Sequence, residues 1–511
     1  MKDKLIDDLL VTILDPEASK SAVHEVQSNV DSMRDKLIDI CDSLWNTAEL
    51  SLIEYESAEL IIDTLTTNGF KMDSIGTSNI PTAFVASYGS GSPAIGVMVE
   101  YDGLPGLGQE AIAEKTPRKD GKTSGHGCGH NIIGAGGLGA ALALKTWMKE
   151  NSIAGTLKVF GAAAEETEGA KVYMARDGLF NDLDACLHLH PFTITSPFHC
   201  RMAAVSMLMI DFEGRTAHAG AAPWQGRSAL HAAELFAHGI AVMREHLEPT
   251  ARTHYIYTNA GVAPNVVVEK AQIKLLVRDI DTQHVAATTE WVKQIAEGCA
   301  MATQTKAKCL VFCGMHDLLP NAPMSNRIYE HMTQIGLPKY TEEEQEFAKK
   351  LQISVGKPPT GMKGTIVPPF DVAPAVGGST DVGDVSYNTP TMGVFVQTIP
   401  PGCGVHTWQA TAAHGMSLGH KAAIMAAKSL ASLGCDLFTD ADLLAAARAD
   451  YETRKGDYVY KSPLPPEMKR PLGLDAIDTG DDAFLAHLHC HDPGHDQGLA
   501  HMEQHIEARG Q

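Results

Sequence analysis

The sequence predicts an α/β protein with a mixed, mainly parallel sheet flanked by helices and an inserted ferredoxin-like domain. Three observations support this. Strands alternate with helices up to about residue 199, which is typical of layered α/β domains. Between about residues 200 and 317 the order becomes β-α-β-β-α-β. The α/β pattern then resumes at "GGSTDVGDVS" and "TPTMGVFVQTIP". We therefore expect one domain at 1–199 and 318–511 and a second at 200–317.

The first half of the chain carries alternating helix and strand signals. Apolar residues at three- and four-residue spacing predict helices in "VDSMRDKLIDICDSLWNTAEL" and "YESAELIIDTLTTNGF". The apolar runs "TAFVASYG" and "AIGVMVEYDGLPG" predict strands. The helix "NIIGAGGLGAALALKTWMKEN", the strand "TLKVFGAAAEETEG", the helix "AKVYMARDGLF" and the strand "DACLHLHP" follow in that order. Pro191 ends the last of these strands.

The inserted segment has its own elements. Strands are expected at "AVSMLMIDFEG", "THYIYTNAG", "NVVVEKAQIKLLVRDID" and "KAKCLVFCG". The helices are "GRSALHAAELFAHGIAVMREHL" and "TQHVAATTEWVKQIAEGCAMATQT". After the insertion, "MSLGHKAAIMAAKSLASLG" predicts a late helix. The chain from about Asp440 turns polar and proline-containing, and we expect it to wrap the surface.

Charge and cysteine content exclude several classes of protein. The 511 residues carry a net charge of −21, which would repel phosphate backbones, so nucleic acid is not an expected partner. The ten cysteines show no paired spacing, which favours a reducing compartment over a disulfide framework. The start "MKDKLIDDLLVTILDPEASK" lacks the order of a signal peptide. We expect a cytoplasmic protein with no membrane partner.

Polar residues that can bind metals follow the predicted strands. Parallel strands place their carboxyl ends at one edge of the sheet, where ligands bind. Cys128 and His130 lie at the start of the following helix, near the same edge. The residues after the strands are Asp102, Glu165, Glu166, His190 and His406.

The set of one thiol, three histidines and several carboxylates suits one or two divalent metal ions. We expect the helix dipole and the metal to favour the Cys128 thiolate. Two alternatives stay open. Cys128 with His126 or His130 could form a nucleophile and base, and "SGHGCGHNIIG" could be an ordinary glycine-rich turn.

Six motifs in order resemble the metallo-aminoacylase and carboxypeptidase superfamily, most of all its p-aminobenzoyl-glutamate hydrolase and β-alanyl-lysine dipeptidase branches. The likeness covers nearly the whole chain from about Met33. The motifs are "EYDGLPGLG", "GHGCGHNIIG", "AAAEETEGAK", "GRTAHAGAAPWQGRSAL", "GGSTDVGDVS" and "VHTWQ".

The resemblance implies an amidohydrolase with two divalent ions, zinc or manganese, in the domain at 1–199 and 318–511. Cys128 would bridge the ions, with His130, Glu166, His190 and His406 as the other ligands. Glu165 would be the general base and later the proton donor, and Asp102 would orient a ligand histidine.

The segment at 200–317 would then be a lid and dimerisation domain. The resemblance implies that His218 stabilises the oxyanion, typically across a homodimer interface. Asn265 and Arg278 would hold the substrate carboxylate. The expected substrate is an N-acyl amino acid or a dipeptide, and the acyl group stays open between aromatic and aminoacyl types. A non-catalytic subunit of a hydrolase is the remaining alternative.

The sequence departs from the family in one respect. Many relatives carry a metal-binding histidine two residues before the aspartate, and here that position is Glu100. His188 competes with His190 as a ligand, and we prefer His190 because relatives keep the histidine directly before the proline. We expect the histidine-rich tail "HLHCHDPGHDQGLAHMEQH" to be polar and without function.

Overall fold

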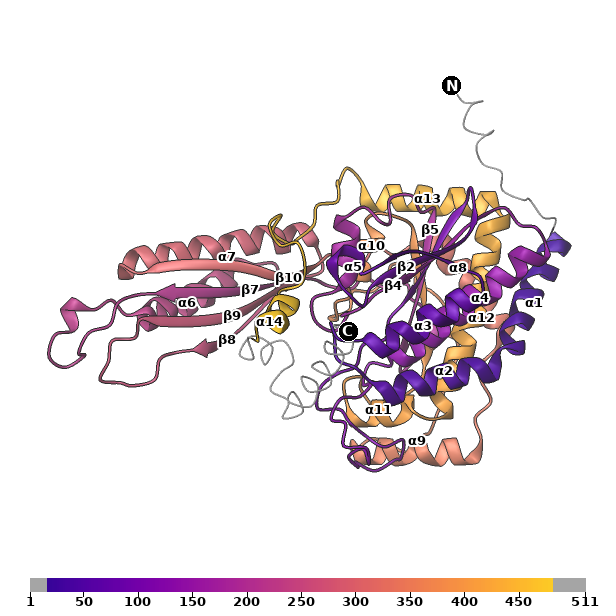
Figure 1. Cartoon of the computed structure of the whole chain (residues 1–511), viewed down its shortest axis with the longest axis horizontal. Coiled ribbons are helices and arrows are strands. Elements are labelled where there is room, and N and C mark those ends of the chain that lie inside the picture. Colours follow the sequence, from indigo (N-terminus) through magenta and orange to yellow (C-terminus); the bar gives the residue numbers. More distant parts are fainter. Residues whose placement is uncertain (1–15, 481–511) are drawn as a thin grey trace, which may run out of the picture.

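The larger of two sheets has seven strands in the order β1-β2-β4-β3-β5-β11-β6 (Figure 1). The structure, a computed structural model, describes residues 16–480, so the histidine-rich tail lies outside the described residues. The central strands β4, β3, β5 and β11 pair in parallel, and the flanking pairs are antiparallel. The predicted mixed α/β fold is confirmed. The strands are β1 Lys71–Ile75, β2 Phe84–Ser90, β3 Ala94–Val99, β4 Gly155–Gly161, β5 Ala185–Phe192, β6 Ser196–Pro197 and β11 Thr391–Gln397.

Helices cover both faces of this sheet. The helices α4 (His130–Glu150) and α12 (Ser417–Thr439) pack together on β3, β5 and β11, and α1 (Pro16–Ser32) and α2 (Arg34–Thr47) lie over them. The connections β3–α4–β4 and β4–α5–β5 run in opposite directions across the sheet. Since such crossovers are right-handed, α5 (Ala170–Arg176) lies on the other face, next to α10 (Val382–Ser386) (Figure 1).

Helix α4 is rich in glycine and alanine because it packs directly on strand β3. A Cβ atom on Gly137 would lie 2.7 Å from the Met98 carbonyl oxygen, so only glycine allows this approach. The helix is buried on all sides over most of its length. The close packing brings the start of α4, with His130, to the end of β3.

The second sheet has four antiparallel strands in the order β10-β7-β9-β8, and it projects from the first sheet along the long axis (Figure 1). Helices α6 and α7 pack on it around a separate apolar cluster. The six elements follow in the order β-α-β-β-α-β, and the role of this segment as a lid or dimerisation domain stays a prediction. They are β7 Ala204–Glu213, α6 Ala229–Met243, β8 Arg252–Asn259, β9 Lys270–Asp279, α7 Thr282–Thr303 and β10 Lys306–Met315.

The C-terminal segment corrects one expectation. The chain after Asp440 is not only a polar surface wrap, because helix α13 (Ala441–Lys455) buries Leu443, Leu444 and Tyr451. The short helix α14 (Leu472–Thr479) buries Leu474 between the two sheets (Figure 1). The remaining helices are α3 Tyr55–Thr67, α8 Ala322–Ile335, α9 Glu342–Ser354 and α11 Trp408–His414.

Among the described residues, α12 alone is long and apolar enough to span a membrane by length and composition. However, 94% of its most apolar window is buried within the protein. Helix α12 is therefore accounted for as a core helix of the α/β domain.

Candidate metal centre and active site

The strand-end residues meet at the carboxyl edge of the four parallel strands. Glu100 and Asp102 follow β3, Glu165 and Glu166 follow β4, and His190 lies near the end of β5. His406 follows β11, and Cys128 and His130 lie at the start of α4. Several of these side chains line one cavity of about 580 Å³.

The turn into α4 depends on Gly129. This residue has φ 86°, in the left-handed region that favours glycine. A Cβ atom here would lie 2.8 Å from Cγ of Pro191, the residue after His190. The backbone amide of His406 donates to the Gly127 carbonyl at 2.9 Å, so the segment after β11 is held beside the same turn.

The structure brings the five expected ligands together as two triads that share one thiol. The first triad is Cys128, His130 and His190, and the second is Cys128, Glu166 and His406. Within each triad the donor atoms lie within 4.8 Å of one another. The Cys128 Sγ is 3.3 Å from His190 Nε2, and the Glu166 carboxylate is 3.3 Å from His406 Nε2.

Two buried polar atoms in this cluster have no hydrogen-bond partner within residues 16–480. They are Nε2 of His130 and Oε1 of Glu166. Buried polar atoms in native proteins almost always have a partner. Thiolate, imidazole and carboxylate donors with free, converging lone pairs fit divalent metal ions such as zinc.

Asp102 holds His130 from the side that faces away from the cluster. Its Oδ1 is 2.8 Å from His130 Nδ1, and its Oδ2 accepts from Ser51 Oγ at 2.8 Å and from the Glu166 amide at 3.0 Å. Burial alone would raise the pKa of Asp102, but the His130 charge and these hydrogen bonds lower it to about 2. The carboxylate therefore fixes the proton on Nδ1 and leaves Nε2 free as a donor atom.

The surroundings of Cys128 do not match those of a nucleophilic cysteine. Burial, and then the carboxylates of Glu166 and Glu165, raise the pKa of the Cys128 thiol well above its usual value. The expected lowering by the helix dipole is therefore wrong for the metal-free chain. A reactive cysteine needs a lowered pKa. This cysteine would lose its proton on binding a metal, which favours the metal site over the Cys-His alternative.

Glu165 faces the cluster beside a buried charge network. Burial, and then the neighbouring Glu100 and Glu166 carboxylates, raise its pKa well above the usual value. Glu100 lies 3.6 Å from His130 Nε2 and 2.8 Å from the buried Lys171 ammonium, which also pairs with Asp381. Burial would raise the pKa of Glu100, but Lys171 and His130 lower it. Glu100, His130 and Glu165 form a third group of possible metal ligands.

Arg278 comes to the same cavity from the near end of β9. Its Nη1 donates to the Gly377 carbonyl at 2.8 Å, and its buried Nε has no partner among the described residues. The rest of the cavity wall is largely apolar. Its aromatic and aliphatic members include Phe192, Ile194, Phe198, Phe370, Val376 and Phe395.

His218 and Asn265 lie together, but far from the cluster of the same chain. They occupy the tip of the second sheet, where His218 forms a bridge with Val266 and the Ala219 amide donates to the Asn265 carbonyl at 3.0 Å. The ten-residue strands β7 and β9 separate this tip from the Arg278 end, a span of about 30 Å. Both side chains are exposed.

Two other histidines have structural surroundings. His126 is buried and donates from Nε2 to the Leu44 carbonyl at 2.9 Å. His188 is buried against the Phe198 ring, 4.6 Å between centroids, and belongs to none of the three ligand groups.

Sequence reasoning missed several residues that support the site. Lys171 and Asp381 lie inside two of the quoted motifs, yet their pairing joins segments 210 residues apart. Single polar residues without a motif gave no signal at all. Those that support the site are Ser51, Glu54 and Glu168.

Comparison with known proteins identifies the family. Residues 96–411 match the family described as peptidase family M20/M25/M40. One of the two p-aminobenzoyl-glutamate hydrolase subunits of Escherichia coli is 33% identical over 86% of this chain and 97% of its own length. The human Xaa-Arg dipeptidase is 25% identical over 83% of this chain and 91% of its own.

Solved structures share the fold. The YXEP protein of Bacillus subtilis, a dinuclear metal binding peptidase, superposes with a TM-score of 0.54 at 18% identity over 79% of this chain and 98% of its own. The aminobenzoyl-glutamate utilization protein of Klebsiella pneumoniae gives a TM-score of 0.51 at 16% identity, over 78% and 98% respectively. This chain therefore belongs to peptidase family M20/M25/M40 and is a metal-dependent hydrolase of amide bonds.

Proposed function

We propose that this enzyme hydrolyses the amide bond between an aromatic acyl group and an amino acid with a free carboxylate. The observation that carries this proposal is the ligand cluster beside Glu165, which opens into a cavity with aromatic walls. The relative from Escherichia coli is named as part of a p-aminobenzoyl-glutamate hydrolase, and that name describes such a substrate.

We infer two divalent ions, zinc or manganese, bound by the two triads that share Cys128. His130 and His190 would complete one set, and Glu166 and His406 the other. When bound, such ions polarise a substrate carbonyl and lower the pKa of a water molecule toward neutrality.

Glu165 has the surroundings of a group that exchanges a proton during catalysis. Its raised pKa, which burial and two neighbouring carboxylates cause, lets it hold a proton near neutral pH. In the proposed reaction its carboxylate takes a proton from the attacking water and returns it to the leaving amine. Asp102 keeps His130 in one tautomer during these steps.

The substrate would lie between Arg278 and the aromatic wall. The guanidinium is half-buried, keeps an unpartnered N–H, and suits a carboxylate through a planar fork. The rings of Phe198 and Phe395 stack at 3.9 Å between centroids, with Phe192 5.2 Å from Phe395. An aromatic acyl group would gain from such a wall by burial and ring contacts.

We further propose a homodimer in which the tip of one second sheet reaches the metal centre of the other chain. His218 and Asn265 cannot serve their own chain's cluster, because the length of β7 and β9 separates them from it. The same tip exposes Trp224 and Val262, with 71% and 103% relative exposure, as an interface would require. The relatives include two different subunits of one hydrolase, which makes a different partner chain the competing outcome.

The first test is a substrate panel on the purified chain loaded with zinc or manganese. The panel contains p-aminobenzoyl-glutamate, benzoyl and acetyl amino acids, and dipeptides that end in lysine or arginine. We expect the aromatic acyl substrates to have the highest kcat/KM. Preference for basic dipeptides would favour the dipeptidase class, and no turnover of any amide would contradict the proposal.

Glu165→Gln separates catalysis from metal binding. We expect the variant to keep its metal and to lose about 100- to 10,000-fold in kcat. Full turnover in a metal-loaded variant would refute the role of Glu165.

Mixing two inactive variants tests the dimer. His218→Ala keeps the metal ligands, and Cys128→Ala keeps the tip. If each site uses the partner's His218, an equal mixture that exchanges subunits should recover about a quarter of wild-type activity. No recovery after demonstrated subunit exchange, or a requirement for a different subunit, would refute the homodimer.

A further inference from the structure

Glu168 joins the loop that carries Glu165 and Glu166 to the far end of the chain. The loop spans residues 162–169, between β4 and α5, and the Glu168 side chain is fully buried. Its two carboxylate oxygens accept the backbone amides of Leu472 and Gly473, each at 2.8 Å. These are the first residues of α14, which has no side-chain cap from its own N-cap residue. Glu168 therefore satisfies two amides that the helix leaves free.

The same loop is held at its other end by two more buried carboxylates. Ala164 has φ 56°, a left-handed conformation that is unfavourable for alanine. Its amide donates to Glu54 at 2.8 Å, and the Glu166 amide donates to Asp102 at 3.0 Å. The loop is thus fixed before Glu165 by Glu54, at Glu166 by Asp102, and after it by Glu168.

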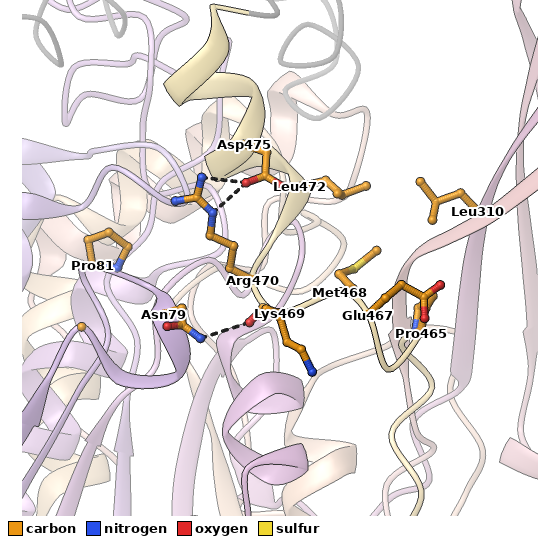
Figure 2. A pocket seen from close by; sticks show the side chains of 11 residues that line it. Asn79, Pro81, Leu310, Pro465, Glu467, Met468, Lys469, Arg470, Leu472 and Asp475 are labelled. Atoms are coloured by element: carbon orange, nitrogen blue, oxygen red, sulfur yellow. Dashed lines mark hydrogen bonds and ion pairs between the residues drawn. The ribbon is translucent and has the colours of Figure 1, made fainter.

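The C-terminal segment 463–479 is firmly anchored and not a loose strand. Arg176, on the helix that follows the loop, donates to the carbonyls of Met468 and Lys469. Asn79 also donates to the Lys469 carbonyl, at 3.3 Å, and Figure 2 shows this contact in the pocket beside the segment. Met468 and Leu474 are buried in the main apolar core.

The segment also touches the second sheet. Pro463 packs on Gly314 of β10, where an added Cβ atom would lie 2.8 Å from the proline ring. Leu310 of β10 and Leu472 line one pocket (Figure 2). The thiol of Cys313, also on β10, donates to the Thr167 carbonyl at 3.3 Å. The loop therefore lies between α14 and the last strand of the second sheet.

We propose that Glu168 is a positioning residue, and that the C-terminal segment 463–479 is a working part of the active site. Through its bonds to the start of α14, Glu168 holds Glu165 at the substrate and Glu166 at the metal cluster. This inference rests on the proposed function. The segment lies beyond residues 96–411, which match the family as a whole, so this support is additional to the shared metal centre.

Glu168→Gln tests the proposal with little change in volume. The amide group of glutamine can face only one of the two N–H donors with its oxygen. We expect kcat to fall roughly 10- to 100-fold and the metal affinity to weaken over a similar range, as for other residues that orient metal ligands. The KM should stay within about twofold, because Arg278 lies on a different strand.

Leu472→Pro tests the same bond from the other side, because it deletes one of the two donors. Proline suits the first helical residue, and Pro471 before it already has the extended conformation that a following proline requires, with ψ 137°. We expect losses of kcat and metal affinity in the same direction. In the double variant with Glu168→Gln the two losses should not add.

Asp478→Asn is the control, since it changes an exposed carboxylate of α14 that pairs only with Arg470 among the described residues. It should keep wild-type kcat and metal affinity. Folded Glu168→Gln with both values within about twofold of wild type would overturn the proposal. If that variant does not fold, a folded Leu472→Pro with wild-type values overturns it equally, as do equal losses in the control. A wild-type chain that cleaves no amide contradicts the proposed function, and the metal titrations still decide the role of Glu168.

Discussion

The replacement of Asp102 by asparagine should weaken metal binding without unfolding the protein. Asp102 uses Oδ1 for His130 at 2.8 Å and Oδ2 for Ser51 and the Glu166 amide. Asparagine has only one acceptor oxygen. If that oxygen faces His130, the NH₂ group faces the Glu166 amide. If it faces the amide, the NH₂ group meets Nδ1 and moves the histidine proton to Nε2, which points at the metal cluster.

The size of the effect follows from the bond that is lost. A hydrogen bond to a charged group contributes about 1.5–3 kcal/mol, and 1.4 kcal/mol corresponds to about tenfold in affinity. We therefore expect metal affinity to fall roughly 10- to 100-fold, in agreement with the effect of other residues that orient metal ligands. Competition with a chromogenic chelator measures the affinity, and elemental analysis measures the bound metal.

A matched control lies elsewhere in the fold. Asp384 makes the same 2.8 Å contact with Nδ1 of His316, outside the three ligand groups. Asp384→Asn should lower the melting temperature and leave the metal affinity of the folded protein unchanged. If Asp102→Asn keeps wild-type metal affinity, or if Asp384→Asn loses it to the same extent, the argument for Asp102 is refuted.

Three other predictions follow from the geometry. Arg278→Lys keeps the charge but loses the planar fork, so KM should rise at least about tenfold with little change in kcat; an unchanged KM would refute carboxylate binding. Gly129→Ala forces a Cβ atom to within 2.8 Å of Pro191 at φ 86°, which should lower the free energy of unfolding by about 1–2 kcal/mol or more, as measured by urea denaturation; an unchanged value would show that the turn relaxes. Burial lowers the pKa of His414 to about 4, below its unfolded value of about 6.5, so its contribution is complete above pH 6.5 and is lost as the pH falls toward 4. Between pH 7.5 and 5.5 the metal-free wild type should lose about 1.4 kcal/mol more than His414→Gln, and equal losses in urea denaturation would contradict this.

Much of the fold could be predicted from the sequence because its signals are local. The apolar runs that became β3, β4, β5 and β11 are each followed by polar residues, and parallel strands end at one edge. That rule alone brought Cys128, His130, Glu166, His190 and His406 into one hypothesis. The catalytic and ligand roles of these residues stay predictions, which the variants above test.

The C-terminal segment shows where local signals were not used or did not exist. Leu443, Leu444, Ala447 and Tyr451 recur at helical spacing in α13, so this helix could have been predicted. The contact of Glu168 with Leu472 could not, because it joins residues 304 positions apart and needs only one carboxylate and a backbone amide. Neither group has a sequence signature.

The sequence by itself determined the α/β class, the inserted β-α-β-β-α-β unit and the chemistry of the donor set, because periodicity and residue type are written along the chain. Only the tertiary structure decided which side chains share a centre. It divided the ligands into two triads around Cys128, and it placed His218 and Asn265 at the far tip of the second sheet. It also tied the loop of Glu165 to α14 through Glu168. Long-range contacts depend on how packed elements meet in space, and no local pattern encodes that.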